Sequence, residues 1–513
     1  MKLVKVYGSA VFGVSSTLIT IETSVSNGIN FHLVGLPDSA VKESQQRIYT
    51  AMIVNGFKMP QKKVVINMAP ADIRKEGAAY DLPLALSLLA ASEQIPAAEL
   101  DDYIIMGELS LDGNLRPIKG ALPIAIMARE MGFKGFILPM ENAREAAVVD
   151  KISVYGVESL KEVVNFFEGT VKPDPVVVNT REEFYKNISK HDVDFSDVKG
   201  QENVKRAMEI AAAGGHNIIM IGPPGAGKTM LAKRLASIIP PLTLREALET
   251  TKIHSVAGKM ERNAGLISQR PFRAPHHTIS DIALVGGGTF PQPGEISLAH
   301  NGVLFLDELP EFRRSVLEVM RQPLEERKIV ISRARFTVEY PANFMLAASM
   351  NPCPCGFYNH PDKPCLCPPG AVKKYLSRIS GPLLDRIDIH IEVVPVAFDR
   401  LAEKQLSEDS STVRNRVIAA REVQRKRFSD NKGVYCNAMM NSSLLRQHCE
   451  LDAAGSSLLK RAMEYMGFSA RAYDRILKVS RTIADLEQSE RINENHLAEA
   501  INYRNLDKEG WAG

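Results

Sequence analysis

The pattern of apolar and polar positions changes along the chain, and the change predicts where folded units begin and end. Phe31 and Leu33 alternate with polar neighbours, which predicts a strand. The apolar run 82–89, with Asp81 before it as a helix cap, predicts a helix. Residues 1–168 are therefore expected to form one α+β domain.

A polar stretch at residues 169–194 interrupts this pattern. Its prolines and charges, including Lys172-Pro173-Asp174-Pro175, leave no periodic apolar face, so we interpret it as a linker. Residues 195–395 are expected to form an α/β nucleotide-binding domain, for the reason given next. Residues 396–513 are almost wholly helical in pattern, with long helices predicted over 413–428 and 469–486.

A phosphate-binding loop follows the apolar run 218–221. Its residues are Gly222, Pro223, Pro224, Gly225, Ala226, Gly227, Lys228 and Thr229. Glycines let backbone N–H groups close around phosphates, Lys228 reaches those phosphates, and the Thr229 hydroxyl is a ligand for Mg²⁺. The following helix adds its positive dipole end. The chain is expected to bind a nucleoside triphosphate with Mg²⁺.

Two acids stand where a second buried strand ends. The apolar run 303–306 leads into Asp307 and Glu308, as in parallel strands that deliver acids to the ligand-binding edge of a sheet. Asp307 is expected to hold the Mg²⁺, and Glu308 is expected to polarise the attacking water. A solvated strand end is the commoner explanation for such acids alone, but the phosphate loop in the same domain favours the functional interpretation.

A strand-end amide and an arginine are further candidates. The run 344–350 ends in Asn351, whose amide is suited to positioning water beside the γ-phosphate. Arg386 follows an apolar helix end, and a guanidinium stabilises transition-state charge because it stays protonated. A salt bridge from Arg386 to Asp385 or Asp388 is an equally good explanation of its spacing.

Composition narrows the class of protein. Of 513 residues 45% are hydrophobic and 24% charged, as in ordinary globular proteins, and the length predicts about three domains. A net charge of +3 means that any nucleic-acid surface must be local. No signal peptide and no membrane-spanning run is recognised, so no membrane contact is expected. Six cysteines are no disulfide framework in such a chain, which indicates a reducing cytoplasm.

The order of these motifs resembles the AAA+ ATPases of the magnesium-chelatase and MCM-like branch, and in particular the ComM (YifB) family. The resemblance covers nearly the whole chain, and its most specific strings are Arg273-Ala274-Pro275-His276-His277-Thr278, Pro293 to His300 and Ile379 to Arg386. It implies ATP as the nucleotide, Asn351 as sensor 1, Arg386 as an arginine finger acting in trans and Arg471 as sensor 2. A finger in trans implies a ring, here a homo-hexamer.

Two basic features are candidates for DNA contact. The pattern over 327–340 predicts a hairpin with Arg333 and Arg335 at its tip, and it resembles the pore hairpin of MCM-like motors. A solvated turn is the alternative. Arginines and Lys426 also form a stripe on the predicted helix 413–428, which could be a solvated face or contact DNA or a neighbouring subunit. The segment 258–298 is expected to project as an insert, and its two adjacent histidines receive no role.

Four cysteines cluster immediately after Asn351. They are Cys353, Cys355, Cys365 and Cys367. Four thiolates can form a tetrahedral zinc site, and a loop with so few apolar residues needs a bound metal or another cross-link to hold its shape. The inner C-x-C spacing is tighter than usual, so reduced thiols without a metal are the alternative.

The front domain resembles the Lon-protease fold. Lon proteases use a serine and lysine dyad, but Ala79 stands at the serine position, and the lysine position falls near Leu122. Lys119 lies close by but has no serine to activate. We therefore expect an inactive protease fold that serves docking or nucleic-acid contact.

These features suggest three candidate functions. The first is an ATP-driven hexameric DNA motor that catalyses branch migration in recombination or natural transformation, with recombination proteins as partners. The second is a chelatase-type ATPase that remodels a partner protein. The third, an ATP-dependent protease, is opposed by Ala79. The arginines of the hairpin and the Lon-like front domain favour the DNA motor.

Overall fold

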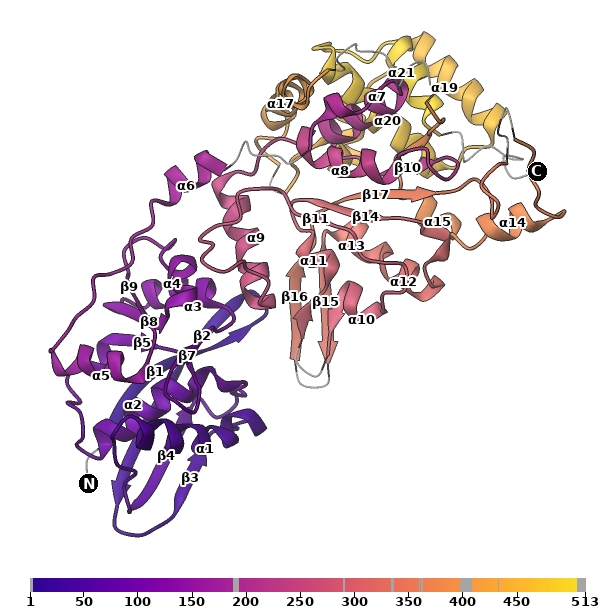
Figure 1. The fold of residues 1–513 in the computed structure, drawn as a ribbon. Helices are drawn as coiled ribbons and strands as arrows, with labels where there is room; N and C mark the ends of the chain where they lie inside the picture. The colour runs from indigo at the N-terminus through magenta and orange to yellow at the C-terminus, as the bar shows by residue number, and fades with distance from the viewer. Residues whose placement is uncertain are drawn as a thin grey trace.

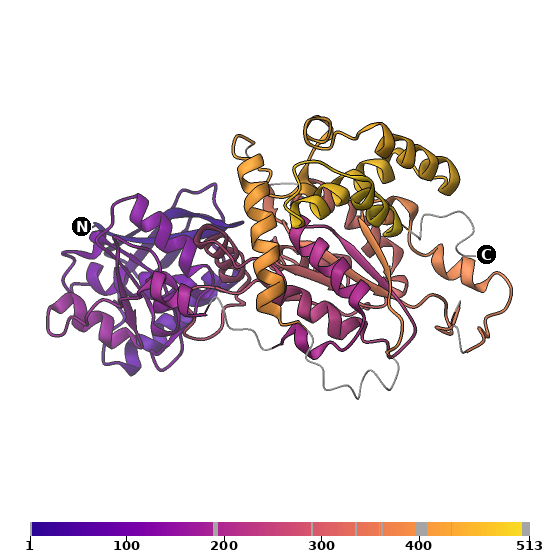
Figure 2. The ribbon, with the colours of Figure 1, turned by 90° about the horizontal axis from the view of Figure 1, so that it is seen from above.

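The structure is a computed structural model that describes residues 3–187, 193–288, 291–333, 336–358, 360, 363–396, 408–431 and 433–504, with the backbone alone at Arg333 and Phe336. Its elements form two lobes that lie side by side (Figure 1, Figure 2). The front lobe is built on a seven-stranded sheet, and the main lobe is built on a five-stranded sheet and the C-terminal helices.

The front sheet is mixed, with strand order β3-β4-β2-β1-β5-β8-β9. Its strands are β1 Leu3–Phe12, β2 Ser15–Ser26, β3 Phe31–Val34, β4 Lys63–Ala69, β5 Tyr103–Ile105, β8 Gly135–Pro139 and β9 Ser153–Val157. The pairs β1–β2 and β2–β4 are antiparallel, and the other pairs are parallel. A small hairpin, β6 Glu108–Leu109 with β7 Leu115–Arg116, completes the strands of this lobe. The expected α+β front fold is confirmed.

Helices cover this sheet. They are α1 Ser39–Val54, α2 Asp81–Ala91, α3 Ala121–Glu130, α4 Met140–Ala146 and α5 Leu160–Glu168. Every residue of α2 is buried, as expected for a helix that is apolar all round. Asp81 is not its cap, because Tyr80 holds that position and the Asp81 carboxylate instead binds Arg47 and the backbone N–H of Leu109.

The expected linker contains a short helix, α6 Thr180–Asn187. Its Phe184 is buried in a small cluster with Leu242 and Ala247 of the main lobe. Earlier in the segment, Val176 and Val178 pack on the front-lobe core, and so few apolar residues produce no periodic pattern in the sequence.

The five-stranded sheet is wholly parallel, with order β11-β14-β17-β10-β18. The strands are β10 Ile218–Ile221, β11 Phe272–Arg273, β14 Val303–Leu306, β17 Met345–Met350 and β18 Ile389–Glu392. Alternate residues enter two different cores: Ile218 and Met220 pack on one face, and Ile219 and Ile221 pack on the other. This two-sided burial explains why the strands are continuous apolar runs.

Both faces of the main sheet are covered by helices. Those of the nucleotide-binding region are α7 Glu202–Gly214, α8 Lys228–Ile238, α9 Leu244–Ala257, α10 Asp281–Val285, α11 Glu295–Leu298, α12 Arg314–Val319, α13 Arg321–Glu326, α14 Ala371–Leu376 and α15 Gly381–Leu384. Two hairpins accompany them, β12 Gly286–Gly287 with β13 Gln292–Pro293, and β15 Lys328–Arg333 with β16 Phe336–Pro341. The predicted insert is only partly a projection, because β11 lies within it and pairs with β14 at the sheet edge.

The C-terminal helices share one apolar core with the main sheet. They are α17 Ser410–Arg427, α18 Ser442–His448, α19 Ala453–Met466, α20 Ala470–Leu486 and α21 Glu494–Asn502. Each begins behind a polar residue whose side chain accepts a backbone N–H, which satisfies the open first turn. These caps are Asp409, Asn441, Asp452, Ser469 and Asn493.

The lobes meet along α9 and along the β15–β16 hairpin. The N–H of Gly120 donates to the carbonyl of Ser255 at 3.1 Å, where α3 faces α9. Val14, in the β1–β2 turn, packs on the apolar cluster that contains Val338 of β16. Among the described residues, no helix has the length and apolar character needed to cross a bilayer.

Candidate nucleotide site and cysteine centre

The phosphate loop runs between β10 and α8, and its shape depends on glycine. A Cβ on Gly222 would lie 2.2 Å from the carbonyl oxygen of Val393, and Gly227 has φ of 85°, which favours glycine. Helix α8 begins at Lys228, so its first N–H groups open into the loop. The phosphate cradle is therefore shaped by its own glycines and by the chain just after β18, which packs closely against Gly222.

Lys228 connects this loop to the end of β17. Its Nζ donates to the carbonyl oxygens of Gly222 at 2.8 Å and Pro223 at 3.0 Å, and to Oδ1 of Asn351 at 3.1 Å. Burial lowers the pKa of Lys228 from its ordinary value, against the opposing effect of Asp307 and Glu308. The ammonium and the strand-end amide thus meet, as the predicted nucleotide site requires.

Asp307 is held by three donors. The Thr229 hydroxyl lies 2.7 Å from its Oδ2, the N–H of Glu308 lies 3.0 Å from its Oδ1, and the Ser349 hydroxyl also binds Oδ1. The Thr229 and Asp307 oxygens are the hard ligands that Mg²⁺ prefers. The contact of Ser349 was not predicted, although its place one residue from the end of β17 brings it to the same sheet edge.

Glu308 has a left-handed backbone, with φ of 53°. Its Oε2 lies 3.5 Å from Nδ1 of His277. Sequence reasoning gave His277 no role. The observation that could have identified His277 is that its loop follows β11. Because β11 runs parallel to β14, the residues after β11 reach the sheet edge at which Glu308 lies.

The two arginines lie apart from these contacts. Arg386 follows α15, is 6% exposed, and forms an ion pair with Glu325 of α13. This pair replaces the salt bridge to Asp385 or Asp388 that was considered as the alternative. Arg471, near the start of α20, pairs with Asp385 at 3.3 Å. Among the described contacts, those of Arg386 and Arg471 include none of the phosphate-loop residues.

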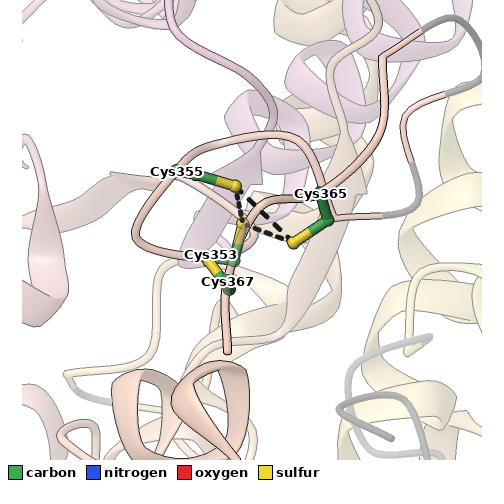
Figure 3. A group of neighbouring side chains, drawn as sticks. All are labelled: Cys353, Cys355, Cys365 and Cys367. Carbon is green, nitrogen blue, oxygen red and sulfur yellow. Dashed lines mark hydrogen bonds between the residues drawn. The ribbon is translucent and has the colours of Figure 1, made fainter. Parts of the chain in front are cut away.

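The four cysteines converge (Figure 3). Their sulfur atoms all lie within 4.8 Å of one another. Cys353 is buried, and its sulfur lies 3.3 Å from that of Cys355 and 3.7 Å from that of Cys365. Desolvation opposes ionisation of Cys355, but backbone hydrogen bonds from Phe357 and Leu366 outweigh it and lower its pKa to about 6. Four sulfurs this close fit the ligand set of a tetrahedral Zn²⁺ or an iron–sulfur cluster.

The cysteine loop also contacts the phosphate loop. A Cβ on Gly356 would lie 2.4 Å from Cδ of Pro224, so only glycine allows this approach. The two loops are therefore in van der Waals contact.

The structure treats the two predicted DNA-contact features, the hairpin and the basic stripe on α17, differently. The hairpin exists and extends away from the main sheet (Figure 1). Arg333 ends β15 and its side chain is not described, while Arg335 lies outside the described residues. The stripe on α17 is mostly engaged within the protein: Arg416 pairs with Glu209 at 2.5 Å, and other partners are Ser237, Ala212, Glu422 and Asp485 for Arg414, Arg421, Arg425 and Arg427.

The positions that correspond to the protease dyad carry no reactive group. Ala79 lies in a short turn of 3₁₀ helix, where its carbonyl accepts the N–H of Gly107 at 2.8 Å. Leu122 is fully buried in α3. Lys119 lies at the lobe boundary, where its Cε would be 2.9 Å from a Cβ on Gly258.

Comparisons with known proteins agree with this architecture. The family described as magnesium chelatase, subunit ChlI, matches residues 194–401, subunit ChlI of Mg-chelatase matches residues 21–142, and the ChlI C-terminal family matches residues 407–504. Lon protease 2 of Bacillus subtilis is 31% identical over 159 residues, which cover 28% of this chain and 27% of that protein.

Two relatives match along almost their whole length. Competence protein ComM of Haemophilus influenzae is 46% identical over 507 residues, covering 98% of each chain. YifB of Escherichia coli is 45% identical over 516 residues, covering 99% of this chain and 98% of its own. With the parallel sheet, the phosphate loop and the Lon-like front lobe, this similarity shows that the chain belongs to the ComM/YifB family of magnesium-chelatase-like AAA+ proteins.

Proposed function

We propose that this protein is an ATP-driven motor that moves on DNA as a hexameric ring, and that it catalyses branch migration in homologous recombination or natural transformation. The observation that carries the ATPase part of the proposal is the contact of Lys228 with Asn351 and of Thr229 with Asp307 at the carboxyl edge of a parallel sheet. The AAA+ family implies ATP and Mg²⁺ for such a site. The name competence protein, carried by a 46% identical relative, supports a role in DNA uptake.

Within this proposal, Glu308 polarises the attacking water, and Asn351 positions that water beside the γ-phosphate. Arg386 acts as the finger of a neighbouring subunit, and Arg471 acts as sensor 2. In the single chain, the Arg386 guanidinium is paired with the Glu325 carboxylate. When the ring assembles, Arg386 must therefore leave Glu325 and bind the γ-phosphate of the ATP held by the neighbouring subunit. That exchange makes hydrolysis depend on assembly.

The ring can be tested by mixing two inactive variants, Lys228→Ala and Arg386→Ala. In a mixed ring, an intact phosphate loop from one variant meets an intact arginine from the other. Recovery of ATP hydrolysis on mixing is expected, and it requires the arginine to act in trans. No recovery, despite hexamers in analytical ultracentrifugation, would show that Arg386 serves its own subunit.

The β15–β16 hairpin is the proposed DNA contact. Its strands have six residues each, so they extend about 20 Å. Arg333 ends the first strand and Arg335 comes just before the second in the sequence, and phosphates are bound by positive charge within reach rather than by base sequence. The front lobe, whose dyad positions are Ala79 and Leu122, is assigned docking or nucleic-acid contact and no proteolysis.

The decisive experiment measures ATP hydrolysis without DNA, with single-stranded DNA and with a four-way junction, at two salt concentrations. A motor on DNA is expected to hydrolyse faster with DNA and to bind it with steep salt dependence. Absence of both responses would refute the DNA function and favour the alternative, a chelatase-type ATPase that remodels a partner protein. The magnesium-chelatase family matches are the observation behind that alternative.

We also propose that the four cysteines hold a structural zinc ion. The convergence of four sulfur atoms within 4.8 Å of one another supports it. Elemental analysis of purified protein is expected to find one zinc per chain, which is lost in Cys353→Ser and retained in the control Cys436→Ser. Metal-free wild-type protein, or iron in place of zinc, would contradict this assignment.

A further inference from the structure

The catalytic carboxylate predicted from the sequence has a partner that no sequence motif assigned. His277 faces Glu308, with 3.5 Å between Nδ1 and Oε2. We propose that His277 is a positioning residue: it holds the Glu308 carboxylate in the direction needed to polarise the attacking water. This inference rests on the proposed ATP site.

The loop that carries His277 is fixed at several points. Arg273 donates from Nε and Nη2 to the two oxygens of Glu295, at 2.6 Å and 2.7 Å. His276 Nδ1 lies 2.9 Å from the Thr278 hydroxyl, and the carbonyl of His276 accepts the N–H of Ile279 at 3.0 Å. Because the backbone is held on both sides of residue 277, its side chain has a defined place.

Ring contacts define the orientation of the imidazole. The rings of His276 and His277 lie 4.1 Å apart at an angle of 34°. On another side, His277 meets the edge of Phe312, with centroids 6.4 Å apart, and Phe312 is itself buried. The His277 side chain is 31% exposed, whereas that of Glu308 is 55% exposed. The better-packed group can therefore steer the freer one.

The energetics indicate that the His277–Glu308 contact serves to orient the carboxylate and not to stabilise the fold. Exposed ion pairs contribute only about 0–1 kcal/mol to folding. Glu308, by contrast, must direct a lone pair at a single water, and misplacement by about 1 Å can cost about 100-fold in rate. The charged imidazole donates from Nδ1, and the neutral ring does so in the tautomer with its proton on Nδ1, so His277 can hold the carboxylate in both of these forms.

The first test replaces the histidine. His277→Ala is expected to lower kcat for ATP hydrolysis about tenfold while KM for ATP and the affinity for a fluorescent ATP analogue stay unchanged. His277→Gln retains an N–H donor and is expected to recover part of kcat, which a packing role would not predict. His32→Ala, at an exposed histidine of the front lobe, serves as the control and is expected to retain kcat.

The second test asks whether His277 acts through Glu308. In a Glu308→Asp background, which shortens the carboxylate, adding His277→Ala is expected to cost less than about twofold, because the contact is already lost. A full additional loss, or unchanged kcat in His277→Ala alone, would overturn the inference. Activity that survives in Lys228→Ala would instead refute the ATP site itself, so the two failures are distinguishable.

Discussion

The ammonium of Lys228 is satisfied by the protein itself, through two loop carbonyls and the Asn351 amide. Phosphate oxygens must replace some of these acceptors when a nucleotide binds. Charge-assisted bonds to phosphate are stronger than bonds to neutral carbonyls, so the exchange favours the bound state. Asn351 would then be free to orient the attacking water. Binding of the nucleotide to the phosphate loop would thus also prepare the site for hydrolysis.

Replacement of Lys228 by alanine should therefore abolish hydrolysis, because no other described side chain in the loop carries a positive charge to the phosphates. ATP turnover in a coupled assay is the measurement. Lys233→Ala is the matched control, since Lys233 lies exposed on the same helix, and it should retain wild-type turnover.

Residues near strand ends were predictable, and residues placed by tertiary packing were not. Asp307 and Asn351 follow apolar runs, and parallel strands bring such ends to one edge. His277 sits in a loop without periodicity, and its contact depends on β11 pairing with β14. Glu325 meets Arg386 only through the packing of α13, so spacing near Arg386 pointed to the wrong carboxylates.

Among the elements, β10, β18 and α20 are joined by buried polar groups. Asp388 accepts the N–H of Asn217 at 3.0 Å and pairs with Arg475 at 2.9 Å and with His216 at 3.4 Å. Burial alone would raise the pKa of Asp388, but Arg475 and His216 outweigh it and hold the pKa well below its ordinary value. The strand before the phosphate loop, the strand after Arg386 and the helix that carries Arg471 are thus held together.

Asp388→Asn should destabilise the protein by about 3–5 kcal/mol, because the buried carboxylate is lost and the half-buried Arg475 would keep its charge without a partner. The pKa of Asp388 is lower in the folded state than in the unfolded state, so the ionised carboxylate stabilises the folded wild-type protein at pH values above the unfolded pKa of about 4. This stabilisation is lost as the pH falls below that value toward the folded pKa. Denaturant unfolding at several pH values measures both effects. Asp385→Asn, at a more exposed pair, should cost about 1 kcal/mol or less, and an equal loss would contradict the argument.

The hairpin of β15 and β16 has its own prediction. Changing Arg333 and Arg335 to alanine should remove DNA stimulation and reduce the slope of log K against log salt by about two, one for each phosphate contact. Basal hydrolysis should persist. Lys328→Ala is the control, because Lys328 lies at the base of the same hairpin and pairs with Glu339 at 2.9 Å. Equal loss of basal and stimulated turnover would place the arginines at the ATP site instead.

Elements with a strong local signal were predicted, including this hairpin and the two long C-terminal helices. Elements that exist because of a distant partner were missed. Strand β11 has two residues and is defined by pairing with β14, and α6 is anchored by one buried phenylalanine. Short segments carry too few residues for a periodicity to appear.

At the scale of the whole molecule, the front lobe contacts the proposed DNA hairpin. Val14 packs on the cluster that includes Val338, and a Cβ on Gly13 would lie 2.9 Å from Cγ1 of Val338. The hairpin is therefore supported from both lobes, and the front lobe can influence DNA contact while remaining far along the chain from the ATP motifs.

Val14→Asp should weaken DNA stimulation of hydrolysis, because a carboxylate cannot replace the apolar contact that supports β16. DNA-dependent and DNA-independent turnover are both measured. Val34→Asp, at an exposed position on the edge strand of the same sheet, controls for added charge. A normal DNA response in Val14→Asp would show that the hairpin works without this support.

The close approach of Gly356 to Pro224 would couple metal binding by the cysteine loop to nucleotide binding by the phosphate loop. If the metal stabilises the shape of the cysteine loop, it also stabilises the phosphate loop against which that loop packs. Thermodynamic reciprocity then requires that ATP raise the affinity for zinc by the same factor by which zinc raises the affinity for ATP. If the proposed zinc site exists, the affinity of this protein for ATP would accordingly depend on the zinc concentration around it.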